Sequence, residues 1–142
     1  MREILFRGKL KVDNGEHKKG DWVFGDLVRI KDGEKTSTMI YGFGEVDPST
    51  VGQYTDLTDK NGKKIFEGDI VKFSYDENDE NPTFCSIEWK SDRACFGYLE
   101  TADKMIEVDS LHCEVIGNIH DNPELLGGGN GGRIKTVSVL RQ

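Results

Sequence analysis

The chain has 142 residues, which suits one domain or two small lobes that share a core, because domains usually hold about 100 to 200 residues. Its 26 acidic residues outnumber the 19 basic ones and give a net charge of -7, so a dominant nucleic-acid-binding face is not expected, since such a face needs clustered lysine and arginine. Three cysteines, no signal peptide before the first strand and no apolar window near the roughly 18 residues of a membrane helix indicate a soluble protein of a reducing compartment.

The first 52 residues are predicted to form an N-terminal lobe built as an antiparallel meander. Residues 3–7 suit a first strand, and residues 21–30 suit a second. One face of the second strand, which we interpret as core, carries Trp22, Phe24, Val28 and Ile30. Residues 36–43 continue the sheet and place on one side Met39, Tyr41 and Phe43. Short turns in which asparagine or aspartate precedes glycine join these strands.

Two single helical turns are predicted where aspartate or asparagine precedes proline. Asp47 can accept hydrogen bonds from exposed amides while Pro48 fits the first helical position. Asn122 and Pro123 repeat this arrangement near the end of a second lobe, which is predicted to cover residues 53–126.

The most consistent local signal is the stretch over residues 53–73, QYTDLTDKNGKKIFEGDIVKF. Asn61 and Gly62 tolerate the backbone conformation of a tight hairpin turn. A second turn, centred on Gly68, precedes a β-branched strand over residues 70–73. Strands joined by such short turns predict a strongly bent, SH3-like barrel.

The rest of the second lobe alternates apolar and polar residues, as further strands do. Residues 83–90 and 94–100 are predicted to form a long hairpin in which Cys85 and Cys95 would be cross-strand neighbours. Shorter strands are expected over residues 105–108 and 112–119.

The last segment, residues 127–142, combines a glycine linker with a stretch that can form a strand. Residues 127–132 contain five glycines and read as a flexible linker. Residues 133–140 alternate, and a strand on a tether needs an edge with which to pair. That edge can belong to another subunit, as in strand exchange, or the segment can stay an unstructured tail; both alternatives are open at this point.

The glycine-rich segments do not predict a phosphate or cofactor site. Gly127 and Gly132 have the separation of a phosphate-binding loop, but Arg133 and Ile134 replace its lysine and hydroxyl residue, and no helix follows. The segment over residues 42–44 lacks the third glycine and the βαβ unit of a dinucleotide site. We therefore expect no cofactor.

Metal and phosphate binding also have simpler alternatives. His112, Cys113 and His120 could supply metal ligands, but adjacent residues of a strand point to opposite faces and no paired motif orients these side chains. The run His-Lys-Lys at residues 17–19 could contact phosphate, although a solvated hairpin tip is the simpler interpretation. No metal site is predicted.

Carboxylates are the remaining group that could support catalysis. Asp56, Asp59, Glu67 and Asp69 lie close in the sequence, and a small hydrolase could use Glu67 or Asp69 if burial raised one pKa. Their positions favour structural roles instead. Asp59 is expected to cap its own turn, and the Gly68-Asp69 corner is expected to fix the start of the next strand.

Four segments resemble the YopX-like family of phage and prophage proteins: MREILFR at the start, WVFGDL from residue 22, the stretch over residues 53–73, and EVIGNIHDNPELL from residue 114. The resemblance covers roughly residues 2 to 126, and the two later motifs are specific in order and spacing. It implies a small, mostly β protein encoded by a temperate phage and acting in the bacterial cytoplasm. It implies no established activity and brings no catalytic residues.

Together these features predict an all-β protein, with an N-terminal antiparallel meander packed on a small SH3-like bent barrel and two single-turn helices. We expect a non-catalytic, self-associating module that binds a host or phage protein, and we do not expect nucleic acid or membrane as partners. The alternatives are a nucleic-acid-binding small β-barrel and a small carboxylate-dependent hydrolase. The residues expected to define the structural motif are Tyr54, Asn61, Gly62, Glu67, Gly68, Asp69, Gly117, Asn118, Asn122 and Pro123.

Overall fold

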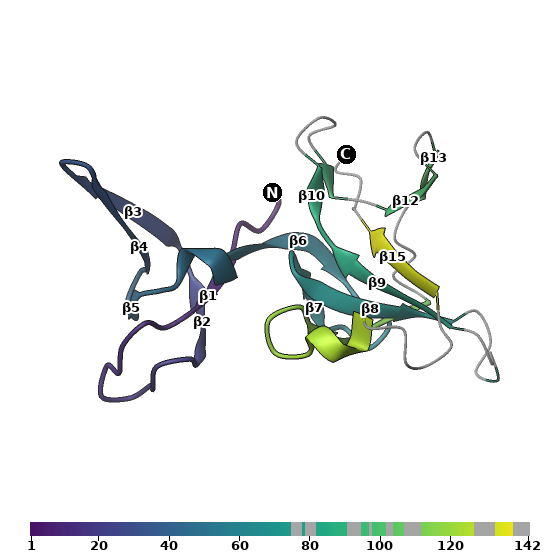
Figure 1. The fold of residues 1–142 in the computed structure, drawn as a ribbon, viewed down its shortest axis with the longest axis horizontal. Helices are drawn as coiled ribbons and strands as arrows, with labels where there is room; N and C mark the ends of the chain where they lie inside the picture. The colour runs from purple at the N-terminus through teal and green to yellow at the C-terminus, as the bar shows by residue number, and fades with distance from the viewer. Residues whose placement is uncertain are drawn as a thin grey trace. The chain divides into compact units, whose positions relative to one another are not determined.

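The computed structural model describes residues 1–74, 78, 82–90, 95–96, 98–101, 104–106, 112–126 and 133–137 (Figure 1). The prediction of an all-β protein is confirmed, since the described elements are β-strands, mostly in antiparallel pairs, and two short 3-10 helices. Neither of these helices has the length and apolar character that crossing a membrane would require. The chain forms two compact units, Met1–Tyr54 and Thr55–Gln142, which we call unit 1 and unit 2.

Unit 1 contains two small antiparallel sheets. In the first, β1 (Phe6–Lys9) lies between β2 (Trp22–Gly25) and the start of β6 (Gly52–Thr58). The second is a meander of three successive strands, β3 (Leu27–Asp32), β4 (Lys35–Ile40) and β5 (Gly44–Glu45). The core of unit 1 consists of the buried side chains of Leu10, Val23, Ile40 and Val46, with Phe6, Leu27, Phe43 and Val51 packed against them.

The strand predicted over residues 21–30 is in fact two strands. The chain changes sheets at Asp26, because β2 pairs with β1 whereas β3 pairs with β4. The change of sheet also decides which side chains are buried. Val23 is 2% exposed and Phe24 is 46% exposed, so the predicted core face of β2 is wrong.

On β4 the more deeply buried side chains lie on the side opposite Met39. Ile40 is fully buried, whereas Met39 is only half-buried and Tyr41 is 74% exposed. On the neighbouring strand Ile30 is 50% exposed. Alternation identifies a strand, but the choice of buried face depends on the sheet's neighbours, and a shift of one residue reverses the two faces.

The choice of face can be tested on two adjacent residues of β2. Truncating Val23 to alanine is expected to lower the free energy of unfolding by about 2 kcal/mol, because it leaves a cavity in the core of unit 1. The larger truncation Phe24→Ala is expected to cost less than about 1 kcal/mol, because Phe24 is 46% exposed and lies outside the core of unit 1. Urea denaturation followed by circular dichroism measures both changes. A larger loss for Phe24→Ala than for Val23→Ala would contradict the described face.

Trp22 lies beneath two cations from the neighbouring strand. The guanidinium carbon of Arg7 is 4.6 Å, and the ammonium nitrogen of Lys9 is 5.3 Å, from the ring centroid. Arg7 is buried, with 7% exposure. These cation–π contacts link β1 and β2 on the face opposite the core.

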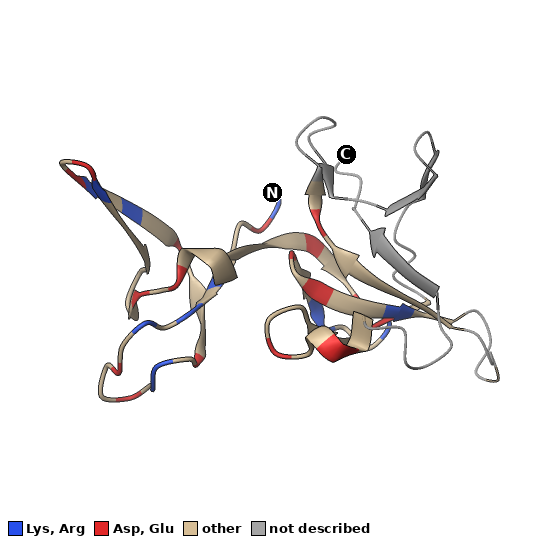
Figure 2. Ribbon diagram, in the orientation of Figure 1, with Lys and Arg blue, Asp and Glu red and all other residues tan. Residues whose placement is uncertain are grey.

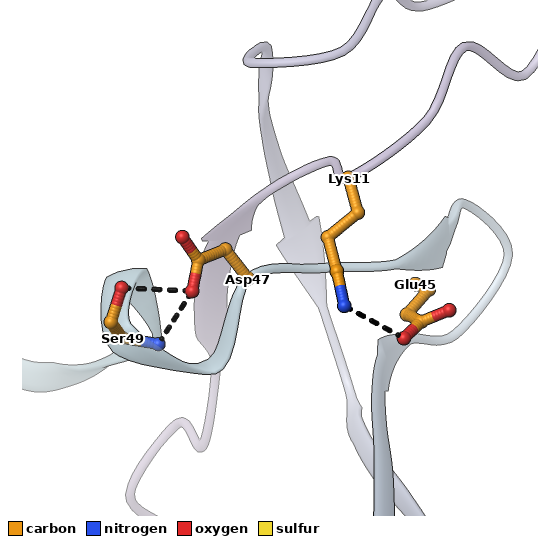
Figure 3. A network of polar contacts seen from close by, with 4 residues as sticks. All are labelled: Lys11, Glu45, Asp47 and Ser49. Carbon is orange, nitrogen blue, oxygen red and sulfur yellow. Dashed lines mark hydrogen bonds and ion pairs between the residues drawn. The ribbon is translucent and has the colours of Figure 1, made fainter.

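The first predicted helical turn is η1 (Pro48–Thr50). Asp47 Oδ1 accepts hydrogen bonds from the Ser49 backbone N–H at 3.0 Å and from the Ser49 hydroxyl at 2.8 Å (Figure 3). Lys11 Nζ lies 3.2 Å from Glu45 Oε1 in an exposed ion pair, also drawn in Figure 3. The cap predicted from the Asp-Pro pair is confirmed.

The main sheet of unit 2 has four strands, in the order β14-β8-β9-β15. Its central strand β8 (Asp69–Phe73) is antiparallel to both β14 (Cys113–Asn118) and β9 (Thr83–Ile87). The outer strand β15 (Arg133–Val137) is parallel to β9. The core of unit 2 consists of Ile65, Val71, Cys85, Ile87, Cys113 and Val115, with Leu57 and Phe73 packed against them.

Smaller elements complete unit 2. β7 (Lys64–Phe66) pairs with the end of β6, β10 (Trp89–Lys90) pairs with β11 (Cys95–Phe96), and β12 (Tyr98–Thr101) pairs with β13 (Lys104–Ile106). The second predicted helical turn is η2 (Pro123–Leu126). The described pairings do not test the closure of these strands into an SH3-like barrel, which stays a prediction.

One expectation for unit 2 needs correction, and the structure bears on one of the two alternatives left open for the last segment. Cys85 and Cys95 are not cross-strand neighbours, because Cys85 pairs with Val71 of β8 while Cys95 pairs with Lys90. The segment after the glycines is not an unstructured tail over its described residues, since β15 pairs with β9 of the same chain. The linker itself, residues 127–132, lies outside the described residues.

Candidate functional site

Two motif segments of unit 2 meet at one end of β8. The turn between β7 and β8 is centred on Gly68, and the chain leaving β14 passes beside it. Asn118 is the strand partner of Asp69, and the Ile119 backbone N–H donates to the Gly68 carbonyl at 2.9 Å. These contacts join two segments that we call the motif corner, residues 66–69 and 117–123.

A buried carboxylate holds the first half of the motif corner. Asp69 is 2% exposed, and its Oδ2 accepts the Phe66 backbone N–H at 2.7 Å. Gly68 has a φ of 91°, in the region that favours glycine, and its N–H donates to the Ile87 carbonyl at 2.8 Å. Glu67 is half-buried in the same turn. The turn is therefore fixed from within by Asp69 and from outside by β9.

Two asparagine side chains hold the second half of the motif corner. Asn118 Oδ1 accepts the backbone N–H groups of His120 at 3.0 Å and Asp121 at 2.9 Å, and Asn118 Nδ2 donates to Asp121 Oδ2 at 3.1 Å. Asn122 Oδ1 accepts the Asn118 N–H at 3.3 Å, and the Asn122 N–H donates to the Asn118 carbonyl at 2.8 Å. The reciprocal bonds close the turn that leads into η2.

Gly117 leaves the space in which the Asn122 side chain lies. A Cβ at position 117 would be 2.5 Å from Asn122 Oδ1 and 2.8 Å from its Cγ, distances that real side chains do not show. The register of β14 against β8 also shifts between Val115 and Gly117. The glycine of the GNIHDN sequence is required by this close approach.

A second buried carboxylate, Asp59, lies at the β6–β7 hairpin of unit 2. Its Oδ1 accepts the backbone N–H groups of Asn61 at 2.8 Å and Lys63 at 2.9 Å, so Asp59 caps its own turn, as predicted. Its Oδ2 accepts the Val115 N–H of β14 at 2.9 Å. Asp59 is 5% exposed, and it joins the hairpin to a strand 56 residues away in the sequence.

Opposing effects act on the pKa of Asp59. Burial alone raises the pKa, because it disfavours the charged carboxylate. The backbone N–H groups of Val115, Lys63 and Asn61, and the charge of the Lys63 ammonium, stabilise the carboxylate and lower the pKa. The net result is a pKa below the ordinary value for aspartate. Asp59 is therefore a charged structural group at neutral pH.

Comparison with known proteins identifies the family. A family model described as YopX protein matches residues 6–127, which include the motif corner and the Asp59 hairpin. The chain belongs to the YopX protein family. Comparison with curated proteins gave no match. Among solved structures, the chain is similar to protein EF1440 from Enterococcus faecalis, with 22% sequence identity, coverage of 89% of this chain and 99% of that chain, and a TM-score of 0.46.

The remaining residues of the predicted YopX motif lie in three places. Tyr54 is 5% exposed, and its N–H donates to the Leu5 carbonyl at 2.8 Å in unit 1. Gly62 has a φ of 80° in the Asp59 hairpin, next to Asn61. Pro123 begins η2. The motif residues therefore come from both units.

The residues weighed for metal binding have different surroundings in this YopX-family chain. Cys113 is fully buried in the core of unit 2, His112 precedes it, and His120 lies in the turn held by Asn118. Over the part of the chain that the structure describes, no group of three or more histidine, cysteine, aspartate or glutamate residues could hold a metal ion.

The basic run at residues 17–19 lies in a loop that carboxylates organise. The Lys18 N–H donates to Asp21 Oδ2 at 2.9 Å, and the Lys19 N–H donates to Asp13 Oδ1 at 2.8 Å. The His17 ring packs edge-on against Phe43, with centroids 5.4 Å apart. Two acids therefore accompany the two lysines, which gives the loop little net charge.

Asp69 offers a direct test of structural against catalytic use. Asp69→Ala is expected to lower the free energy of unfolding by about 1–2 kcal/mol, because the buried Phe66 N–H loses its acceptor. Asp69→Asn is expected to recover part of this loss, because its amide oxygen can still accept that bond. Urea denaturation followed by circular dichroism measures both. Equal losses for the two variants would contradict this role for the Oδ2 acceptor.

Sequence reasoning missed two features of the site. The bond from Val115 to Asp59 and the contact of Asn122 with Gly117 each depend on where β14 lies, which local patterns do not specify. The usable signal is the short spacing of glycine and asparagine in GNIHDN, which is typical of a tight, side-chain-bonded turn.

Proposed function

We propose that this YopX-family chain is a non-catalytic protein-interaction module, encoded by a temperate phage or prophage, that works in the bacterial cytoplasm. The observation that carries the proposal is an exposed apolar face of the β3-β4-β5 sheet. Ile30 is 50% exposed, Val28 and Met39 are half-buried on the same side of the sheet, and Tyr41, in the turn that follows β4, is 74% exposed. Grouped exposed apolar side chains favour protein binding. We call these four residues the outer face.

The roles of the motif carboxylates support a non-catalytic function. Asp59 and Asp69, the two buried acids of the motif segments, accept hydrogen bonds from backbone N–H groups of the fold. For Asp59 these bonds lower the pKa, whereas a general acid needs a raised pKa. These acids therefore favour a structural role for the motif.

Capture of partners from a bacterial host after prophage induction tests the interaction. The intact chain is expected to retain a partner that the double variant Ile30→Asp and Tyr41→Asp loses, because charge on the outer face prevents apolar contact. Val12→Asp is the matched control, since Val12 is 58% exposed outside the β3-β4-β5 sheet. Circular dichroism checks that all variants fold. Identical capture by all three proteins, or capture by none, would contradict the proposal.

Self-association is the second part of the proposal. β15 follows the glycine linker and pairs in parallel with β9, so the same pairing can form between two copies by strand exchange. Light scattering gives the mass of a particle and therefore the number of copies in it. We expect more copies per particle for the full chain than for a chain ending at Leu126. An oligomer that persists without residues 127–142 would remove strand exchange from the proposal.

A further inference from the structure

The charge of the chain is distributed unevenly between its units. Residues 1–54 contain nine basic and nine acidic residues, whereas residues 55–142 contain ten basic and seventeen acidic ones. The whole net charge of -7 therefore belongs to unit 2, and unit 1 is balanced. Within unit 1, Figure 2 shows basic residues along the β3–β4 hairpin and acidic ones at its turn.

β3 is the end strand of its sheet, whose order is β3-β4-β5, and among the described strands it pairs only with β4. The Tyr41 N–H donates to the Asp26 carbonyl at 2.9 Å. Because the backbone groups of alternate residues in an antiparallel pair face the partner strand, the even-numbered residues of β3 are the ones that bond to β4. Leu27, Arg29 and Lys31 therefore direct their backbone N–H and C=O groups to the other side. We call that side the β3 edge.

The side chains along the β3 edge divide by chemistry between the two faces of the strand. Arg29 and Lys31 lie on one face and are exposed, and neither forms an ion pair or hydrogen bond through its side chain with another described residue. Val28 and Ile30 lie on the opposite face, which is the outer face. A strand added here would meet basic groups on one side and apolar groups on the other.

We propose that β3 binds an extended peptide with alternating acidic and apolar side chains, which adds to the β3 edge as an antiparallel strand. Backbone hydrogen bonds to Leu27, Arg29 and Lys31 supply affinity, and the two faces select the sequence. Each peptide residue opposite Arg29 or Lys31 shares its face, so these positions take the acidic side chains. This inference rests on the proposed interaction function and names its surface and its partner chemistry.

A second copy of β3 fits this edge poorly. In a two-fold antiparallel pair of β3 strands, Arg29 lies opposite itself when residue 29 is at the centre, and opposite Lys31 of the other copy when residue 30 is at the centre. Like charges directly opposite each other destabilise a strand pair. An acidic peptide avoids this repulsion, which is why the charge pattern favours a different partner.

Calorimetric titration with a capped synthetic peptide in which glutamate and valine alternate tests the proposal. The peptide is expected to bind the full chain at low salt and to bind about tenfold more weakly after Arg29→Glu and Lys31→Glu, because two attractive contacts become repulsive. Lys18→Glu and Lys19→Glu, which change the same charge in the loop of unit 1, are expected to leave binding within about twofold. A peptide of the same composition with its glutamates in one block is expected to bind at least about tenfold more weakly.

Methylation of the peptide nitrogens separates strand addition from charge attraction. In the proposed register the glutamate N–H groups face β3 and the valine N–H groups face away. A peptide with an N-methyl group on every glutamate is therefore expected not to bind. A peptide with an N-methyl group on every valine is expected to bind as the parent peptide does. Equal effects of the two methylated peptides, or no binding of the parent peptide, would overturn this inference. The proposed interaction function is judged separately, by whether the Ile30 and Tyr41 variant loses its captured partner.

Discussion

Replacement of Asp59 by alanine is expected to lower the free energy of unfolding by about 3 kcal/mol, a larger loss than replacement of Asp69 causes. The change removes the acceptor of three backbone N–H groups and leaves the Val115 N–H buried without its partner. Hydrogen bonds to a charged group contribute more than neutral ones, and a buried orphan donor adds a desolvation cost. Urea denaturation followed by circular dichroism measures the loss.

Asp47→Ala is the matched control for Asp59→Ala. Asp47 also accepts a backbone N–H through its carboxylate, but it is exposed, so water can replace the lost bond. Its loss is expected to cost about 1 kcal/mol, as for other helix caps. A cost for Asp59→Ala no larger than that for Asp47→Ala would show that the link to β14 contributes little.

The lowered pKa of Asp59 predicts a pH dependence of stability. The pKa is lower in the folded than in the unfolded chain, so the unfolded state binds more protons at pH values near these two pKa values. Stability therefore rises with pH there. The contribution of the ionised Asp59 is therefore complete above the unfolded pKa of about 3.9 and is lost as the pH falls through the folded value. The stability difference between the intact chain and Asp59→Asn is expected to be constant above about pH 5 and to shrink below about pH 4. A stability difference that grows as the pH falls would contradict the predicted direction of the pH dependence.

Gly117→Ala is expected to lower the free energy of unfolding by about 2–3 kcal/mol, because the new methyl group and the Asn122 amide cannot both stay in place. The displaced Asn122 also loses its hydrogen bond to the Asn118 N–H. The effect is expected in the same denaturation measurement, with NMR shifts concentrated at residues 117–123.

Two further variants identify the cause of the Gly117 effect. Gly117→Ala combined with Asn122→Gly is expected to cost less than the sum of the single changes, because the clash disappears when the amide is absent. Gly20→Ala is expected to cost about 1 kcal/mol, since Gly20 has a φ of 92° but nothing lies within 4 Å of the position that the new methyl group would take. Additive losses in the double variant would contradict the described contact.

Local chemistry in the sequence is sufficient to predict the turns and caps. This holds for the Asp59 hairpin with Gly62, the corner at Gly68 and the cap at Asp47, which all depend on residues within a few positions of one another. Because these elements need no information from the rest of the chain, they appear where the sequence predicts them. The same holds for the all-β character.

Features that depend on distant neighbours could not be predicted. Alternation places Phe24 in the core instead of Val23, because the pattern is symmetrical between the two faces of a strand. The bond of Asp59 to Val115, and the parallel pairing of β15 with β9, each join residues about 50 positions apart, and no local pattern encodes such a partner. In the candidate site, sequence therefore identified the turns but not what holds them together.

The position of Trp22 beneath Arg7 and Lys9 has a practical consequence for following the chain in solution. The chain has two tryptophans, and the other, Trp89, is 38% exposed in unit 2. Replacing either one by phenylalanine leaves a single indole emitter that belongs to one unit. Trp22 emission should shift to the red when its cations leave the ring, whereas Trp89 already meets solvent. Intrinsic fluorescence can therefore report whether the two units melt together or in turn.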